Sequence, residues 1–272
     1  MNDHSPPASL STTRPTPPPA DPVRGGSPRW LFGSYDYPVS HRVLELGSLV
    51  VFVALGVALS ARLAQPLTDR LAWTTAPLMI AALAVGLLAA DLFSGIVHFL
   101  FDQYGSPQTP VIGRKFVAPF RDHHADPLAM THGDFIGINS DNLLICLPVM
   151  GLTLALADVD AHPYTGLFVL ALVAGAAMTN QIHKWAHMPA VPKSVQFAQR
   201  HGLILGVDHH DCHHRAPYDR HYCITFGRLD AVLDVVTTRL SPGSAGRTGR
   251  AHRHQPPCIE DRSGRQTDHH AT

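Results

Sequence analysis

The segment HHDCHH at residues 209–214 holds the densest group of potential metal ligands in the sequence. On a helix, His210, His213 and His214 fall at positions i, i+3 and i+4 and project from one face, and His209 forms a further i, i+4 pair with His213. Imidazole binds iron, zinc, copper and nickel alike, so the pattern predicts a metal site without choosing the metal. A solvated or nucleic-acid-contacting surface is the alternative, but 21 Lys+Arg against 21 Asp+Glu gives nucleic-acid binding no support.

Three earlier groups add to this set. They are the i, i+4 pair His183 and His187 in HKWAH, the adjacent His123 and His124 in RDHHADP, and Asp91, His98 and Asp102 at i, i+7 and i+11 in DLFSGIVHFLFDQYG. Alone, the first pair could be an ordinary helix end and the second an ordinary polar loop. A polar group inside an apolar run is costly near lipid, so Asp91 and His98 are expected to have functional partners. Four ligands saturate one tetrahedral metal. Eight or more histidines therefore predict two metals, and two irons with positions left open for oxygen fit the count.

The remaining histidines and the cysteines are less informative. Of the 19 His, 13 lie between His98 and His221, so the enrichment does not come from the ends of the chain. No metal role is expected for His41, His162 or His221, and the roles of His132 and His201 stay open. Disordered ends are expected to hold His4, His252, His254, His269 and His270. Four Cys without CxxC spacing exclude a cysteine-based zinc ribbon and give no framework for a disulfide-stapled secreted domain.

Four apolar runs predict the helices that must position these side chains. They cover residues 46–61, residues 71–90 with a continuation to 101, residues 142–157 and residues 161–183. The third run has only 16 residues and is interpreted as a short tilted span or a re-entrant helix. The sequence therefore predicts an all-α integral membrane protein with about four transmembrane helices and a cytosolic histidine-rich cap that binds two metals.

Charge placement predicts orientation, because Lys and Arg in short connections favour the cytoplasmic side. Basic residues precede the first run, lie in the 102–141 loop and follow the fourth run, whereas Arg62 and Arg70, between the first and second runs, are a mild counter-signal. Both termini and the metal site are therefore predicted to be cytoplasmic, and the Ala-, Arg-, Gly- and Pro-rich composition favours a bacterial inner membrane. Residues 1–40 are predicted to be a disordered Pro-rich tail, 41–240 the membrane domain and 241–272 a second disordered tail.

As a set, these motifs resemble the Kua-type lipid desaturases, the plasmanylethanolamine desaturase family, which also includes a plant fatty-acid desaturase of the chloroplast. The matching stretches are DLFSGIVHFLFDQYG at 91–105, FVAPFRDHHADP at 116–127, DFIGINSDN at 134–142, TNQIHKWAH at 179–187, and HHDCHHRAP with YCITFG between 209 and 227. Two positions depart from the family pattern. Gly133 stands where the family has a His, with His132 one position earlier, and Gly137 replaces an acidic residue.

The resemblance implies that residues 41–240 form an oxygen-dependent lipid desaturase with a His-ligated di-iron centre, which converts the alkyl ether of a plasmanyl phospholipid into the vinyl ether of a plasmalogen. The metal ligands it implies are His98, His123, His124, His183, His187, His210, His213 and His214, with His209 as a further candidate. Near neighbours that fix imidazole tautomers would be Asp102, Asp126, Asn139 and Asn180, of which Asp102 and Asn180 are the predicted catalytic residues.

Cofactors and partners follow from this chemistry. Two Fe²⁺ ions and O₂ as co-substrate are expected, and the phospholipid is the membrane partner. The sequence has neither a strand-linked GxGxxG nor a Cys set for an iron–sulfur cluster, so electrons must come from an external carrier of cytochrome b5 type or ferredoxin type. Candidate partners for the lipid phosphate are Arg114, Lys115, Arg121 and Lys184, which are equally compatible with ordinary positive-inside residues.

Three other functions are compatible with the histidines. A fatty-acyl desaturase or hydroxylase would use the same metal site, and the lipid product separates it from an ether-lipid enzyme. A zinc-dependent membrane hydrolase would keep its activity without oxygen and usually shows HExxH, which is absent from the sequence. A non-enzymatic metal carrier or sensor would release its metal readily and would not need histidines beside a lipid-facing cleft.

Overall fold

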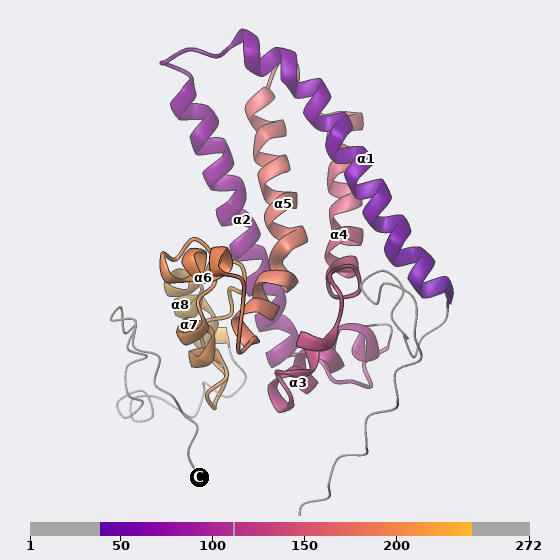
Figure 1. The fold of residues 1–272 in the computed structure, drawn as a ribbon, viewed down its shortest axis with the longest axis vertical. Helices are drawn as coiled ribbons and strands as arrows, with labels where there is room; N and C mark the ends of the chain where they lie inside the picture. The colour runs from indigo at the N-terminus through magenta and orange to yellow at the C-terminus, as the bar shows by residue number, and fades with distance from the viewer. Residues whose placement is uncertain (1–38, 111, 241–272) are drawn as a thin grey trace, which may run out of the picture. The chain divides into compact units, whose positions relative to one another are not determined.

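All regular secondary structure in the described part of the chain is helical. The computed structural model describes residues 39–110 and 112–240. The predicted C-terminal tail and nearly all of the predicted N-terminal tail lie outside these ranges. The helices are α1 (Val39–Asp69), α2 (Ala76–Gln103), η1 (Gly113–Val117), α3 (Ala118–Ala125), η2 (Ala129–His132), α4 (Phe135–Leu156), α5 (Pro163–His187), α6 (Lys193–Arg200), α7 (Val207–His213) and α8 (Asp230–Leu240) (Figure 1). The predicted all-α class is confirmed.

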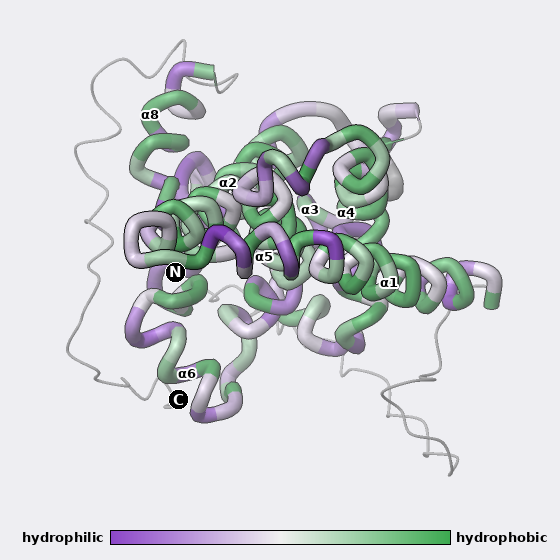
Figure 2. Tube along the Cα trace, turned by 90° about the horizontal axis from the view of Figure 1, so that it is seen from above, coloured by the Kyte–Doolittle hydropathy of each residue, from purple (hydrophilic) through white to green (hydrophobic). Residues whose placement is uncertain are grey.

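Four of these helices, α1, α2, α4 and α5, are long and apolar enough to cross a membrane. Their predominantly hydrophobic colouring is visible in Figure 2. The third of them differs from its sequence prediction, because α4 begins at Phe135 and continues through Asp141. The carboxylate of Asp134 accepts a hydrogen bond from the backbone N–H of Gly137 at 2.8 Å and caps this start. With 22 residues, α4 is about 33 Å long, which matches a hydrocarbon core of about 30 Å.

The chain direction alternates through the four long helices. The α1–α2 and α4–α5 connections lie at one end of the bundle, while the end of α2, the start of α4 and the end of α5 lie at the other (Figure 1). The short helices α3, α6, α7 and α8 gather at this second end, where every predicted metal ligand is found. His162, at the start of α5, lies at the opposite end.

Close packing of α2 on α5 depends on small residues. A Cβ atom added to Gly86 would lie 2.4 Å from the carbonyl oxygen of Phe168, and one added to Gly175 would lie 2.7 Å from the Cβ of Ala90. Small residues at such contacts let helix backbones approach closely, which is how helices associate in lipid. On the other side of α5, Leu59 and Met150 belong to a buried core shared by α1, α4 and α5.

Polar clasps fix the elements that carry the histidines. Asn180 donates to the carbonyl of Ile138 at 2.7 Å, and the side-chain oxygen of Asn139 accepts from the N–H of Gln181 at 3.1 Å, so α4 and α5 are joined twice. Asp91 was predicted to have a functional partner. Its fully buried carboxylate accepts the four consecutive N–H groups of residues 226–229 at 2.7–3.2 Å. Asp91 thereby fixes the loop before α8 to α2.

Gly86→Ala is expected to destabilise the protein although alanine favours a helix. The new Cβ would meet the backbone of α5, and overpacking of this kind costs about 1–3 kcal/mol, more than the gain of about 1 kcal/mol in helix propensity. The measurement is the midpoint of thermal unfolding in detergent, which should fall. Gly151→Ala is the matched control, since nothing lies within 4 Å of its added Cβ. Equal midpoints for the two variants would show that the approach at Gly86 does not limit packing.

Candidate metal centre

Nine side chains from four helical segments converge in two groups at one end of the bundle. The segments are α2, α3, α5 and α7, with His214 directly after α7. In each group the potential ligand atoms all lie within 4.8 Å of one another. The five-histidine group contains His123, His183, His187, His210 and His214, and the carboxylate group contains His98, Asp102, His124 and His213. All eight histidines that the family resemblance implied as ligands therefore lie in one group or the other.

In the five-histidine group, the ring nitrogens of the imidazoles face one another instead of facing backbone or carboxylate oxygens. The Nε2 atom of His210 lies 2.8 Å from those of His183 and His187 and 3.1 Å from that of His214. The ring of His123 completes the group, with its centroid 4.6 Å from those of His183 and His187, and its buried Nε2 has no hydrogen-bond partner. A zinc–nitrogen bond of about 2.0–2.1 Å places neighbouring ligand nitrogens about 3 Å apart, which is the spacing seen here.

The carboxylate group is centred on one oxygen of Asp102. This Oδ2 atom lies 3.1 Å from Nε2 of His124 and 3.3 Å from Nε2 of both His98 and His213. The side chains of His98 and His213 are fully buried, and that of Asp102 is 3% exposed. Water therefore has little access to these atoms.

Backbone carbonyls fix the tautomers of two of these imidazoles. The Nδ1–H of His98 donates to the carbonyl of Tyr222 at 3.1 Å, and that of His213 donates to the carbonyl of Arg220 at 2.8 Å. A neutral imidazole has one N–H, so each Nε2 turns a lone pair toward the Asp102 carboxylate. Neither Nε2 has a hydrogen-bond partner. Lone pairs that converge on a buried anion repel unless a cation lies between them, so this donor set fits a bound metal.

Burial keeps imidazoles of the five-histidine group in the neutral form, which is the form that binds metal. Burial, together with the charge that neighbouring histidines would carry, lowers the pKa of His123 to about 2 and that of His214 to about 3. The same causes lower the pKa of His210 well below its usual value. These imidazoles are therefore neutral near pH 7, with lone pairs free for coordination. Imidazole and carboxylate donors suit iron and zinc.

Other predicted residues lie outside the two groups. His209 belongs to a third group with His221 and Asp230, although His221 was expected to have no metal role. The position of His221 depends on a turn in which this residue has a φ of 59°. Residue spacing in the sequence does not reveal this turn. Asn139 and Asn180 join α4 to α5, as described above. Asp126 follows the last residue of α3, and His132 is the last residue of η2.

The predicted phosphate partners have contacts of their own. Arg121 donates to the carbonyl of Gly105 at 2.9 Å, and Lys184 donates to that of Gly133 at 2.5 Å. The latter contact places Lys184 beside one of the two positions that depart from the family pattern. The side chains of Arg114 and Lys115 lie outside the described part of the structure.

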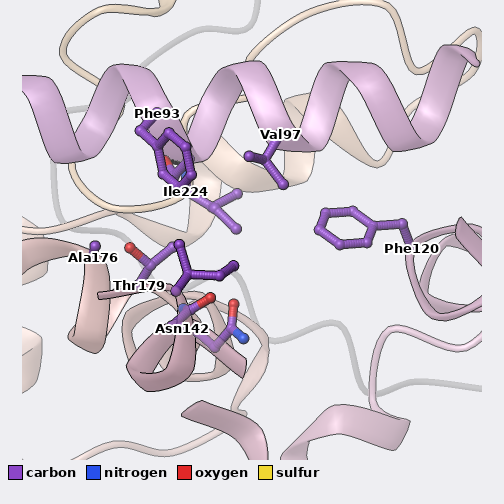
Figure 3. A pocket seen from close by; sticks show the side chains of 10 residues that line it. Phe93, Val97, Phe120, Asn142, Ala176, Thr179 and Ile224 are labelled. Carbon is purple, nitrogen blue, oxygen red and sulfur yellow. Dashed lines mark hydrogen bonds between the residues drawn. The ribbon is translucent and has the colours of Figure 1, made fainter. Parts of the chain in front are cut away.

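A cavity of about 50 Å³ is lined mainly by residues of α2, α4 and α5, and none of its lining residues is a histidine. In Figure 3, Phe93 and Val97 of α2 face Asn142 of α4 and Thr179 of α5 across this cavity, with Phe120 at its side. Its remaining lining residues are Ser94, Ile145, Ala176, Asn180 and Ile224. The Phe120 ring also lies edge-on to His98, with centroids 5.2 Å apart, so one aromatic side chain borders both the cavity and the carboxylate group.

Fold and site together define an all-helical membrane protein with a buried, histidine-rich centre. Residues 87–239 match the family described as the lipid desaturase domain, and the chain belongs to this lipid desaturase family. It is 41% identical over 202 residues to the plasmanylethanolamine desaturase of Myxococcus xanthus. The aligned stretch covers 74% of this chain and 70% of the relative.

Two further relatives are similar over shorter stretches. Plasmanylethanolamine desaturase 1 of Mus musculus is 39% identical over 171 residues, 60% of this chain and 63% of the relative. The chloroplastic fatty acid desaturase 4 of Arabidopsis thaliana is 35% identical over 152 residues, 55% of this chain and 46% of the relative. No solved structure gives a significant match. The family makes the chain a lipid desaturase, an oxidoreductase that acts on lipids.

Asp102→Asn is expected to lower the number of metal ions bound per chain. The change removes the only negative charge of the carboxylate group while keeping the size of the side chain. Metal analysis of the purified protein in detergent should find about one ion fewer per chain in the variant than in the wild type, because the carboxylate group loses its ion. Asp160→Asn, in the exposed turn before α5, is the control and should match the wild type. An unchanged metal content in Asp102→Asn would rule out Asp102 as a ligand.

Proposed function

We propose that this protein is an oxygen-dependent di-iron desaturase that converts the alkyl ether of a plasmanyl phospholipid into the vinyl ether of a plasmalogen. The observation that carries the proposal is the mainly apolar cavity between α2, α4 and α5, which borders the carboxylate group through Phe120. The choice of an ether lipid is supported by 41% and 39% identity to relatives named plasmanylethanolamine desaturase.

In this proposal, each group of ligands holds one iron. The five-histidine group supplies only neutral donors, whereas the carboxylate group supplies three imidazoles and the Asp102 carboxylate. When bound, the two irons supply the O₂ activation that is needed to break an unactivated C–H bond. The protein supplies the geometry. Carbonyls of Tyr222 and Arg220 orient His98 and His213, and burial excludes water from the reacting atoms.

The cavity positions a short part of the lipid chain. Its small volume fits a few atoms of an alkyl chain, while exposed apolar side chains of α2 and α4 can face the rest of the chain in the bilayer. Val97 immediately precedes His98 on α2, and Thr179 lies one turn before His183 on α5. A chain segment in the cavity would therefore lie near the carboxylate group, which Phe120 also borders, and about one helical turn from His183 of the five-histidine group.

Electron counting requires an external donor. Removing two hydrogens from adjacent carbons provides two electrons, and reduction of O₂ to two waters takes four, so two electrons and two protons must come from elsewhere. We propose a carrier of cytochrome b5 type or ferredoxin type that docks at the end of the bundle where the histidines lie. This end faces the cytoplasm of a bacterial inner membrane in the proposed orientation, in agreement with the basic residues of its loops.

A fatty-acyl desaturase is the second candidate, because a relative at 35% identity is named fatty acid desaturase 4. The same cavity and ligands would serve, and the difference would lie in the group that links the chain to the lipid head. Product analysis distinguishes the two candidates directly.

The test is lipid mass spectrometry of cells that express the protein with an electron donor and receive an alkyl-ether phospholipid, with and without oxygen. Wild type and the control His162→Ala, at the opposite end of the bundle, should yield an acid-labile product two hydrogens lighter in the presence of oxygen. His213→Ala should yield at least about 100-fold less, since it removes a fully buried ligand.

Two results would contradict the proposal at different levels. Acyl chains that gain a double bond while ether lipids stay unchanged would keep the metal centre and replace the substrate. Unchanged lipids despite verified iron content and a working donor would exclude desaturation.

A further inference from the structure

A third group of metal-binding side chains lies apart from the two described above. It consists of His209 on α7, His221 in the following loop and Asp230 at the start of α8, with its potential ligand atoms all within 4.8 Å of one another. The Nε2 atom of His209 lies 2.7 Å from Oδ2 of Asp230 and 3.1 Å from Nδ1 of His221. The proposed desaturase chemistry uses none of these three residues.

Protons alone do not satisfy this arrangement well. If Nε2 of His209 carries its proton, one N–H must serve both the carboxylate and the Nδ1 lone pair of His221. If His221 donates instead, the His209 lone pair faces the Asp230 carboxylate at 2.7 Å. The second carboxylate oxygen of Asp230 is already engaged, because it accepts the N–H of Cys223 at 2.8 Å. One cation bound by all three atoms satisfies each of them without a shared proton.

The surrounding backbone leaves room beside the coordinating nitrogen. Gly227 has a φ of 68°, and a Cβ atom there would lie 2.7 Å from Nε2 of His209. The loop that contains Gly227 is fixed by the Asp91 carboxylate, and the N–H of His221 donates to Asp234 of α8 at 3.0 Å. The three side chains are therefore held by an ordered framework, as a binding site requires.

We propose that His209, His221 and Asp230 form a separate binding site for a single divalent transition metal, with zinc as the best fit. Two imidazoles and one carboxylate with a fourth position open to water form a common zinc coordination set. The side chain of His209 is 19% exposed, so the site is reachable from solvent without passing through the buried groups. A bound ion would tie α7 to α8 and thereby hold the HHDCHH segment against the bundle.

Counting zinc ions tests this site independently of desaturation. The full-length protein in detergent is freed of metal, saturated with Zn²⁺ and washed, and the zinc content per chain is measured. His221→Gly removes the imidazole while glycine tolerates the φ of 59° at this position. His201→Ala, an exposed histidine after α6, is the matched control. The expected result is one zinc fewer per chain in His221→Gly than in the wild type and in the control.

Two results would overturn the proposal. Equal zinc content in His221→Gly and the wild type would show that the three residues form only a hydrogen-bonded network. A loss of more than one zinc would show that they support the two buried groups and are no separate site. If His221→Gly does not yield folded protein, His209→Gln on the solvent-accessible side of α7 is measured with the same two criteria. Because the readout is zinc bound per chain, a failed lipid assay leaves this result unaffected.

Discussion

The structure depends on the buried imidazoles and carboxylate of its centre, which have too few N–H groups to satisfy all of their lone pairs by hydrogen bonds. Each neutral imidazole has one N–H, and His98 and His213 direct theirs at backbone carbonyls, which leaves lone pairs facing the Asp102 carboxylate. In the five-histidine group, nitrogens approach one another to 2.8–3.2 Å. Unpaired polar atoms of this kind are costly in an apolar interior, and bound cations are the solution that fits both groups. The helices, clasps and loops hold these atoms together against their mutual repulsion.

Much of that holding joins residues that are far apart in the sequence. Asp91 on α2 captures the four N–H groups of residues 226–229, and the segment between α7 and α8 then runs back across α2. This return brings the carbonyls of Arg220 and Tyr222 to the imidazoles that they orient. Gly95 permits the contact, because an added Cβ would lie 2.6 Å from the sulfur of Cys223. One buried carboxylate and one glycine of α2 thus help to hold the carbonyls that fix the tautomers of His98 on the same helix and His213 on α7.

Helical spacing predicted the principal ligands because most of them follow local rules. His183 with His187 and His210 with His214 are i, i+4 pairs, and the members of each pair meet in the five-histidine group as expected. Spacing did not predict the division into two groups, the place of Asp102 among the donors or the separation of His209. These features depend on how α3, α7 and the 220–230 loop fold onto α2 and α5. The predicted third run begins at residue 142, seven residues after the start of α4, because a run without charged residues cannot include Asp141. The helix does include this residue.

The origin of the ligands also sets the order of biogenesis. Because α2 supplies the first ligand at position 98 and the last lies at position 214, neither group of donors is complete until the ribosome has made all four spans and α7. Both groups draw on α7 and on segments before it, so a chain still being inserted holds only partial sets. A complete set of donors for either metal is therefore a late product of synthesis. Until α7 has been made, the growing chain holds the histidines of α2, α3 and α5 without the partners that complete their groups.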